Sequence, residues 1–394
     1  MKKVLKSIAQ ILAGAAIGVG GMSLIMWLVD GGLPAAHSHS EGVDAGLMLL
    51  SIGLATLWLI VAIILHLILH EAGHLIMGLL TGYQFLSFRV FKLTLVKTDK
   101  GLRWKRYHIA GTGGQCILTL PTNQEVRSAP WFWYNAGGVL MNLLLVALSV
   151  VILRLFHLGI VGTSFFIMMA FMGLCIALIN GIPMMIGGMS NDGLNIWTLW
   201  RHPDERRFFV RMLQTVGLLS SGKRMSELPE EWFEDIPVTE NASYQEINNR
   251  LFYMSLLEDK MQLDEARQIA EEIMALGKKL PQLFRMEVAG ERVMLELMTT
   301  KRLEVVDELW DKQLLRYTEM NSKYSPIKCA VLYTVELIHN QDYTKADAYK
   351  QQLEGHKYDY TMPGEALTAI ALVNTAFEVQ KNVLLQEDTE KNYY

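Results

Sequence analysis

The chain has 394 residues, a formal net charge of −4 and 51% hydrophobic residues, so it is long enough for two domains. The charge is uneven, because residues 1 to 200 hold 12 Lys or Arg against 7 Asp or Glu, whereas residues 201 to 394 hold 24 against 33. The second half has no basic stripe interleaved with aromatic residues, and the three cysteines form no CxxC pair, so we expect neither a nucleic-acid partner nor a thiolate metal site.

Four apolar runs in the first half are long enough to cross a bilayer, at about 7–29, 46–80, 134–156 and 162–182. The first run follows three lysines, but it is longer than the apolar part of a signal peptide, so we expect a retained anchor. Residues 81–130 carry eight Lys or Arg and residues 30–45 carry none. The positive-inside rule therefore places both termini in the cytoplasm, and we expect a bacterial cytoplasmic membrane.

The second apolar run contains His70, Glu71 and His74 with the spacing HExxH. In a helix the two histidines lie about 40° apart on one face, one turn from each other, with Glu71 at the edge of the same arc. Two imidazoles in this arrangement can hold one zinc ion, while the carboxylate acts as general base toward a water molecule. The alternative is a set of packed polar residues at a helix-bundle seam, although such groups are costly in hydrocarbon unless they are paired.

Other histidines lie near this motif in the sequence. His66 extends the stripe by one turn, and it is either a group that supports a metal ligand or, as we expect, a satisfied or water-facing histidine. His37 and His39 fall in a polar loop, for which we expect no metal role.

The segment from 83 to 120 alternates around Phe88, Val90, Leu93 and Leu95, turns at 98–101 and resumes at Leu102. This pattern predicts a β-hairpin. An enzyme that cuts a helical substrate in the membrane has to hold an unwound segment, and an edge strand beside the metal would do so by β-augmentation. The alternative is a basic hairpin that rests on anionic lipid head groups.

A catalytic zinc held by two histidines needs a third protein ligand, and Asp192 is the best candidate. It follows the last apolar run after Pro183 and several glycines, which break the helix and allow the chain to turn back toward the site. The alternative is an Asn-Asp-Gly turn at the membrane interface.

These motifs resemble the site-2 protease family of intramembrane zinc metalloproteases. HExxH at 70–74 matches the first element of that family, Asn180 and Pro183 followed by Asp192-Gly193 look like its NxxP…DG element, and 136–142 looks like its AGPxxN stretch. The resemblance implies that His70, His74 and Asp192 ligate Zn²⁺, that Glu71 is the catalytic base, and that Asn142 and Asn180 bind substrate, for which interhelical hydrogen bonding is the alternative. Val139 stands at the usual proline, and Gly187-Gly188 lengthens the stretch before Asp192.

The second half begins with a juxtamembrane helix and linker at 201–242 and continues as a soluble helical domain at 243–394. Similar segments begin at Leu263, Leu303 and Tyr343, 40 residues apart, which resembles tetratricopeptide-type solenoids with a typical repeat of about 34 residues. Such a domain would bind a cytoplasmic protein partner, or it would only stabilise the chain. The predicted fold class is mainly α: a polytopic membrane bundle of about four spans at 1–200 with a membrane-associated β-hairpin, followed by an α-helical repeat domain.

Two functional hypotheses follow. The first is a zinc endopeptidase that cleaves membrane-anchored proteins or small hydrophobic peptides within the bilayer. The second is a non-catalytic membrane scaffold whose helical domain binds partner proteins. Glu71 favours the enzyme, since a scaffold has no need for a carboxylate between two histidines.

Overall fold

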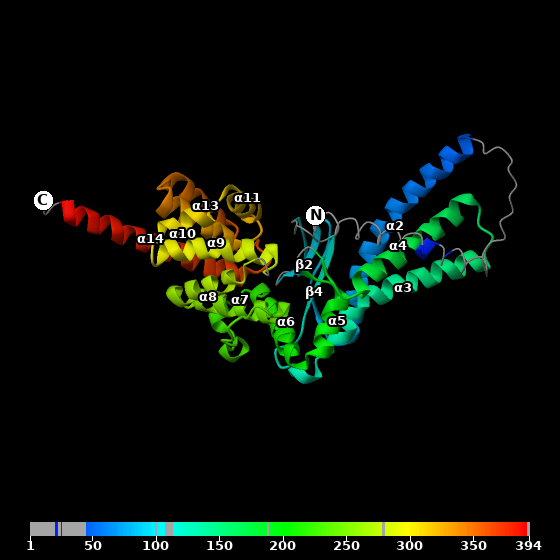
Figure 1. Ribbon diagram of the computed structural model, residues 1–394, viewed down its shortest axis with the longest axis horizontal. Helices are drawn as coiled ribbons and strands as arrows, with labels where there is room; N and C mark the ends of the chain where they lie inside the picture. The colour runs from blue at the N-terminus through cyan, green and yellow to red at the C-terminus, as the bar shows by residue number, and fades with distance from the viewer. Residues whose placement is uncertain are drawn as a thin grey trace.

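The computed structural model describes residues 20–22, 25, 45–98, 101–106, 113–186, 189–277 and 280–391. The described part is mostly helical, with a small antiparallel sheet between a group of long apolar helices and a domain of shorter helices (Figure 1). The expected first span at 7–29 lies almost wholly outside the described residues, as do His37 and His39.

Within the described residues, three helices are long and apolar enough to cross a membrane. They are α2 (Ala45–Leu80), α3 (Trp131–Leu155) and α4 (Ile160–Gly181), which pack against one another and confirm the second, third and fourth predicted runs as helices. The side chains that face outward from them are apolar, including Leu144, Leu148 and Val151 on α3, as expected for a lipid-facing surface.

Glycines bring α2 and α3 into backbone contact. A Cβ on Gly73 would lie 2.3 Å from the carbonyl oxygen of Gly137, and a Cβ on Gly137 would lie 2.4 Å from the carbonyl oxygen of Gly73. No other residue fits at either position without separating the helices, which is how small residues act at membrane helix interfaces. The contact lies beside His74, so it determines how closely α3 approaches the candidate ligands.

The predicted hairpin is part of a larger sheet. Strands β1 (Gln84–Val90), β2 (Leu93–Thr98), β3 (Gly101–Arg106) and β4 (Gly114–Thr119) pair antiparallel in the order β3-β2-β1-β4. The β2–β3 hairpin follows the predicted turn, with Thr98 opposite Gly101. Leu102 and Trp104 on β3 are 61% and 64% exposed, so the outer hairpin carries an uncovered apolar surface.

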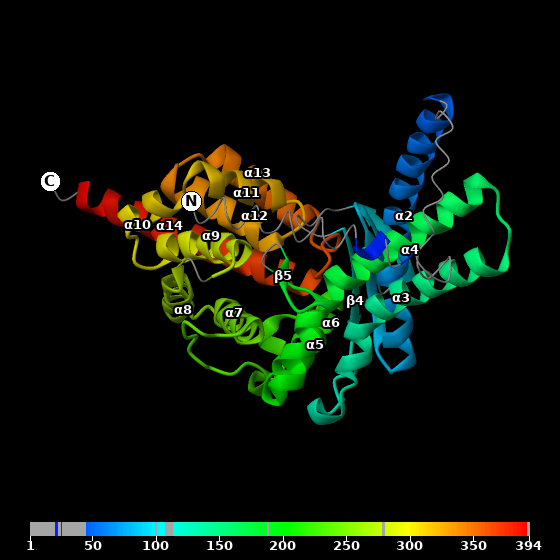
Figure 2. The same ribbon diagram turned by 45° about the vertical axis from the view of Figure 1, so that its right-hand side comes forward.

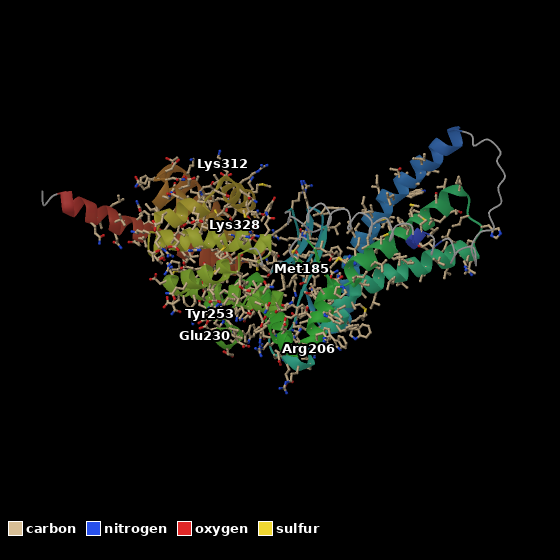
Figure 3. All side chains as sticks on the ribbon, in the orientation of Figure 1. Met185, Arg206, Glu230, Tyr253, Lys312 and Lys328 are labelled. Atoms are coloured by element: carbon tan, nitrogen blue, oxygen red, sulfur yellow. The ribbon has the colours of Figure 1, made fainter. Side chains whose placement is uncertain are left out.

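Two short helices lead from the long apolar helices to the second half of the chain. These are α5 (Asp192–Arg201) and α6 (Arg206–Ser220). Trp197 and Trp200 on α5 are exposed, and the guanidinium of Arg206, labelled in Figure 3, lies 4.7 Å from the centre of the Trp131 ring. Exposed tryptophans beside arginines are typical of the membrane–water interface.

The second half is a helical domain with its own core. Its helices are α7 (Tyr244–Asp259), α8 (Leu263–Ala275), α9 (Gln282–Met298), α10 (Leu303–Leu309), α11 (Lys312–Asn321), α12 (Pro326–Thr334), which continues as a π-helix to His339, α13 (Tyr343–Gly355) and α14 (Pro363–Lys391). The ammonium of Lys105 on β3 donates to the carbonyl oxygen of Asp359 at 2.5 Å, so the outer strand contacts the loop before α14. Figure 2 shows the helical domain on one side of the sheet and the long apolar helices on the other.

Buried carboxyls make the stability of the helical domain depend on pH. Burial raises the pKa of Glu291 from 4.5 to about 8 and that of Glu365 from 4.5 to about 7, although the nearby Lys328 charge acts in the opposite direction. The folded state therefore binds protons that the unfolded chain has released, so this contribution to stability is complete below pH 4.5 and is lost as the pH rises to about 8.

We expect amides of α9 and α14 in the full-length protein to be less protected from hydrogen exchange at pH 8 than at pH 6, after correction for intrinsic rates. The double variant Glu291→Gln, Glu365→Gln removes these two groups and keeps buried Glu258, whose pKa burial also raises, so its protection should vary less with pH than that of the wild type. An equal pH dependence in the variant and the wild type would contradict this assignment.

Candidate metal centre

Helix α2 places His70 and His74 one turn apart on its buried face. Their Nε2 atoms lie 3.2 Å from each other, and the two residues are 6% and 8% exposed. The Nδ1 atom of His74 lies 2.7 Å from the backbone carbonyl oxygen of Tyr134 at the start of α3. A carbonyl only accepts, so Nδ1 carries the proton and, in the neutral ring, Nε2 of His74 presents a lone pair.

Asp192, in the first turn of α5, completes a triangle with the two histidines. Its Oδ2 atom lies 3.1 Å from Nε2 of His70 and 3.4 Å from Nε2 of His74. In tetrahedral coordination with bonds of about 2.0–2.1 Å, neighbouring ligand atoms are about 3.3 Å apart. All three sides of the triangle are close to that length, so these residues can hold a metal ion.

The surroundings of Asp192 also fit a cation. Its Oδ2 is buried and makes no hydrogen bond within the described part of the chain. Burial raises the pKa of the Asp192 carboxyl, but the electrostatic effect of the adjacent His74 and His70 rings outweighs burial and holds that pKa well below its usual range. When the facing imidazole nitrogens carry no proton, they cannot donate a hydrogen bond to this carboxylate oxygen. A metal ion between these atoms would stabilise it.

Asn191 is the residue that directs Asp192 into the site, and we did not identify it from the sequence. Its side-chain oxygen accepts from the backbone N–H of Leu194 at 2.9 Å, as an N-cap of α5, and from the N–H of Met184 at 3.1 Å. Its amide nitrogen donates to the carbonyl oxygens of Ile179 and Ile182, both at 2.7 Å. One side chain therefore joins the start of α5 to the end of α4.

The segment before Asp192 contains two short paired strands. Strands β5 (Met185–Ile186) and β6 (Met189–Ser190) pair antiparallel, and Gly187 and Gly188 between them lie outside the described residues. Because a hairpin returns the chain to its starting point, the insertion does not displace Asp192. Gly193 packs against α4 so closely that a Cβ there would lie 2.1 Å from the carbonyl oxygen of Gly181.

Glu71 lies between the histidines and the sheet. A Cβ added to Gly114, the first residue of β4, would be 2.6 Å from Oε1 of Glu71, so the carboxylate lies against the backbone of that strand. Arg89 on β1 is 1% exposed and donates to the carbonyl oxygens of Phe91 and Gly114 at 3.1 and 3.4 Å. The alternation read from the sequence highlighted Phe88 and Val90, but Ser87 and Arg89 are the buried side chains of β1.

The two asparagines expected to bind substrate have intramolecular partners. The amide of Asn142, which is fully buried on α3, lies between the imidazoles of His66 and His70. The amide nitrogen of Asn180 donates to the carbonyl oxygen of Ile176 in its own helix at 3.0 Å. These contacts favour the interhelical role for Asn142. They also show His66 as a fully buried histidine with partners for both ring nitrogens, which is the satisfied one of the two expected states.

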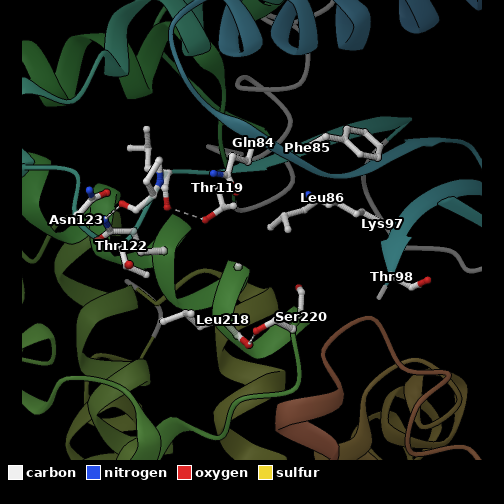
Figure 4. Close-up of a pocket in the computed structure, with 15 residues that line it drawn as sticks. Gln84, Phe85, Leu86, Lys97, Thr98, Thr119, Thr122, Asn123, Leu218 and Ser220 are labelled. Atoms are coloured by element: carbon white, nitrogen blue, oxygen red, sulfur yellow. Dashed lines mark hydrogen bonds between the residues drawn. The ribbon is translucent and has the colours of Figure 1, made fainter. Parts of the chain in front are cut away.

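A separate cleft of about 540 Å³ lies at the other end of β4 (Figure 4). Its lining comes from the ends of β1, β2 and β4 and from α6, and includes Lys97, Thr98, Thr119 and Ser220. Thr119 joins the strand to α6, because its hydroxyl donates to the carbonyl oxygen of Leu213 at 2.9 Å. The six residues of β4 extend over about 17 Å, so the cleft is distinct from the metal centre.

Gly138 on α3 provides a steric test of the centre. A Cβ at this position would lie 2.5 Å from Nε2 of both His70 and His74. We therefore expect Gly138→Ala to reduce the metal content of the purified protein to background, measured by mass spectrometry of the elements. Gly53→Ala, where the added methyl meets no described atom within 4 Å, is the matched control and should keep the metal content of the wild type. A full complement of metal in Gly138→Ala would contradict the assigned position.

Comparison of the chain with known protein families, curated proteins and solved structures found no match.

Proposed function

We propose that the protein is a zinc-dependent endopeptidase that hydrolyses peptide bonds of membrane-anchored proteins or small hydrophobic peptides at or within the bilayer. The observation that carries this proposal is the placement of Glu71 between a triangle of three ligand atoms and the edge strand of a sheet. His70, His74 and Asp192 would hold the metal. Zinc, when bound, supplies Lewis acidity that polarises a carbonyl group and lowers the pKa of water toward about 7.

Glu71 would act as the general base and then as the general acid. Its carboxylate takes a proton from water while the water oxygen attacks the carbonyl carbon of the peptide bond. The C–N bond then breaks, and Glu71 returns the proton to the leaving amine. The apolar helices around the site exclude bulk water and so strengthen these electrostatic interactions.

Strand β4 is suited to hold an extended substrate. It pairs with β1 on one side and is the last strand of the described sheet. The N–H of Phe91 donates to the carbonyl oxygen of Gly113, so Gly113 directs its backbone groups toward β1. Because this direction alternates along an antiparallel strand, Gly114 and Cys116 direct their backbone groups away from β1. The hydroxyl of Tyr134 donates to the Cys116 carbonyl oxygen at 2.8 Å and Arg89 donates to the Gly114 carbonyl oxygen at 3.4 Å, so a substrate strand would take the place of these donors.

A substrate strand added to β4 would extend from Glu71 beside Gly114 to the cleft beside Thr119. At about 3.3 Å per residue it would place a residue about five positions from the scissile bond in the cleft. The cleft would accept the polar segment that flanks a membrane anchor, because hydroxyl, amide and backbone groups form much of its lining.

The helical domain would bind a protein partner on the cytoplasmic side, in an orientation with both termini inside the cell. Helices α8, α10 and α13 begin at Leu263, Leu303 and Tyr343, at the predicted interval of 40 residues. The left-handed residues Met261, Lys301 and Gln341 precede them at the same interval. This periodicity supports the repeat hypothesis.

The experiment that tests the proposal compares membranes that contain the wild-type chain with membranes that contain Glu71→Gln. We expect at least one membrane protein or hydrophobic peptide to be shortened only in the wild type, and its cleavage to stop when a zinc chelator is added. If no such product forms in cells that express the wild-type chain, the scaffold hypothesis replaces the protease.

A further inference from the structure

His66 lies close to the centre, and the proposed function does not use it. It lies one turn before His70 on α2 and is fully buried among α2, α3 and α4. Its Nδ1 atom lies 3.0 Å from the side-chain oxygen of Asn142, and its Nε2 atom lies 2.9 Å from the backbone carbonyl oxygen of Met169. The side-chain nitrogen of Asn142 lies 2.9 Å from Nδ1 of His70, so Asn142 connects His66 to a candidate ligand.

The hydrogen bonds that link Met169, His66, Asn142 and His70 can be assigned a direction, starting from the carbonyl of Met169. The carbonyl of Met169 can only accept, so Nε2 of His66 must donate to it. A neutral His66 then has its lone pair on Nδ1, which must accept a hydrogen bond. Asn142 can supply that bond only through its NH₂ group, and its oxygen must then point to His70.

A half-turn of the Asn142 amide reaches that arrangement without moving either imidazole, because the nitrogen and the oxygen exchange places. In the orientation in which the amide nitrogen faces His70, His66 would have to carry a proton on both ring nitrogens to satisfy Asn142 and Met169. A cation in a buried apolar site is costly. The neutral arrangement is therefore preferred.

The orientation of the amide decides what His70 can do. When the Asn142 oxygen faces His70, Nδ1 of His70 donates and Nε2 presents a lone pair to Nε2 of His74 and Oδ2 of Asp192, at 3.2 and 3.1 Å. When the Asn142 nitrogen faces His70, Nδ1 accepts, and in a neutral ring Nε2 carries the proton and cannot bind a metal. His74 needs no such arrangement, because the Tyr134 carbonyl already determines its tautomer.

We propose that His66 is a positioning residue of the metal centre: acting through the Asn142 amide, it holds His70 in the tautomer whose Nε2 is free to bind the metal. The inference rests on the proposed metal site, but it does not depend on which substrate is cleaved. Hydrogen-bonded groups behind metal-binding histidines typically change metal affinity by about 10- to 100-fold when they are removed.

Three full-length variants test this role, each purified in detergent and titrated with Zn²⁺ against a chromophoric chelator. His66→Phe keeps a planar ring but cannot accept from Asn142, so we expect the dissociation constant to rise by about 10- to 100-fold. His66→Gln can accept from Asn142 through its oxygen and donate to Met169 through its nitrogen, so it should bind zinc within about threefold of the wild type. Ser149→Ala removes another buried hydrogen bond of α3, from Ser149 to Leu145, and should leave the affinity unchanged.

A double variant distinguishes tautomer control from packing. Asn142→Asp has only acceptor oxygens, so it needs no neighbour to orient it toward His70. We expect Asn142→Asp to restore zinc affinity in the His66→Phe background, with Co²⁺ absorption bands like those of the wild type. Failure of this restoration, or equal loss in His66→Gln and His66→Phe, would overturn the proposal in favour of a packing role. If the wild-type protein itself binds no Zn²⁺, the metal site and the proposed function fail first.

Discussion

Glu71→Gln should lower the rate of peptide hydrolysis by about 10²- to 10⁴-fold, the usual contribution of a general acid–base group. The amide keeps the size of the carboxylate beside Gly114 but cannot take a proton from water. The triangle of His70, His74 and Asp192 does not include Glu71, so metal content and thermal stability should remain those of the wild type. The measurement is the cleavage rate of a confirmed membrane substrate by the purified full-length protein in detergent or lipid.

The matched control for this variant is Glu125→Gln. Glu125 is an exposed glutamate that precedes the short 3₁₀ turn before α3, and the same change there should leave the rate unaltered. Equal rates in Glu71→Gln and the wild type would remove Glu71 from the proposed mechanism. Loss of metal in Glu71→Gln would instead show that the carboxylate supports the metal centre.

Local patterns made part of this architecture predictable. Apolar runs identify the three long apolar helices of the described chain, and HExxH places two imidazoles on one helical face, since both depend only on residues near in sequence. The starts of α8, α10 and α13 could also be read from the 40-residue interval. The predicted hairpin was correct for β2 and β3. The strand beside Glu71 is β4, which the sequence pattern did not identify as a separate strand.

Contacts between distant segments could not be predicted in this way. His66 was expected to be either satisfied or facing water. The sequence could not decide between these two states, because the partners of His66 lie 76 and 103 positions away and nothing in its own helix indicates them. Buried Arg89 reverses the expected alternation of β1. It lies on the face opposite Val90 and Gly114, and its guanidinium donates to the backbone carbonyl oxygens of Phe91 and Gly114, which no local pattern indicates. Asn191 was considered only as part of a turn, although its side chain binds the ends of both α4 and α5.

Asp192→Ala should abolish high-affinity metal binding while the fold is retained. The variant removes the only carboxylate of the triangle, and two imidazoles alone are fewer protein ligands than zinc sites use. Asp192 is also in the first turn of α5, where an acidic residue is worth about 0.3–1 kcal/mol, so the loss of helix stability is small. The hydrogen bonds by which Asn191 joins the end of α4 to the start of α5 are unchanged, so α5 stays in place.

Thermal unfolding with and without added Zn²⁺ measures this effect through linkage. A ligand at 100 times its dissociation constant stabilises the folded state by about 2.7 kcal/mol, so the wild type should gain thermal stability with zinc and Asp192→Ala should not. Asp204→Ala, at an exposed aspartate just after α5, is the control and should respond like the wild type. A zinc-dependent gain of wild-type size in Asp192→Ala would show that the third ligand comes from elsewhere.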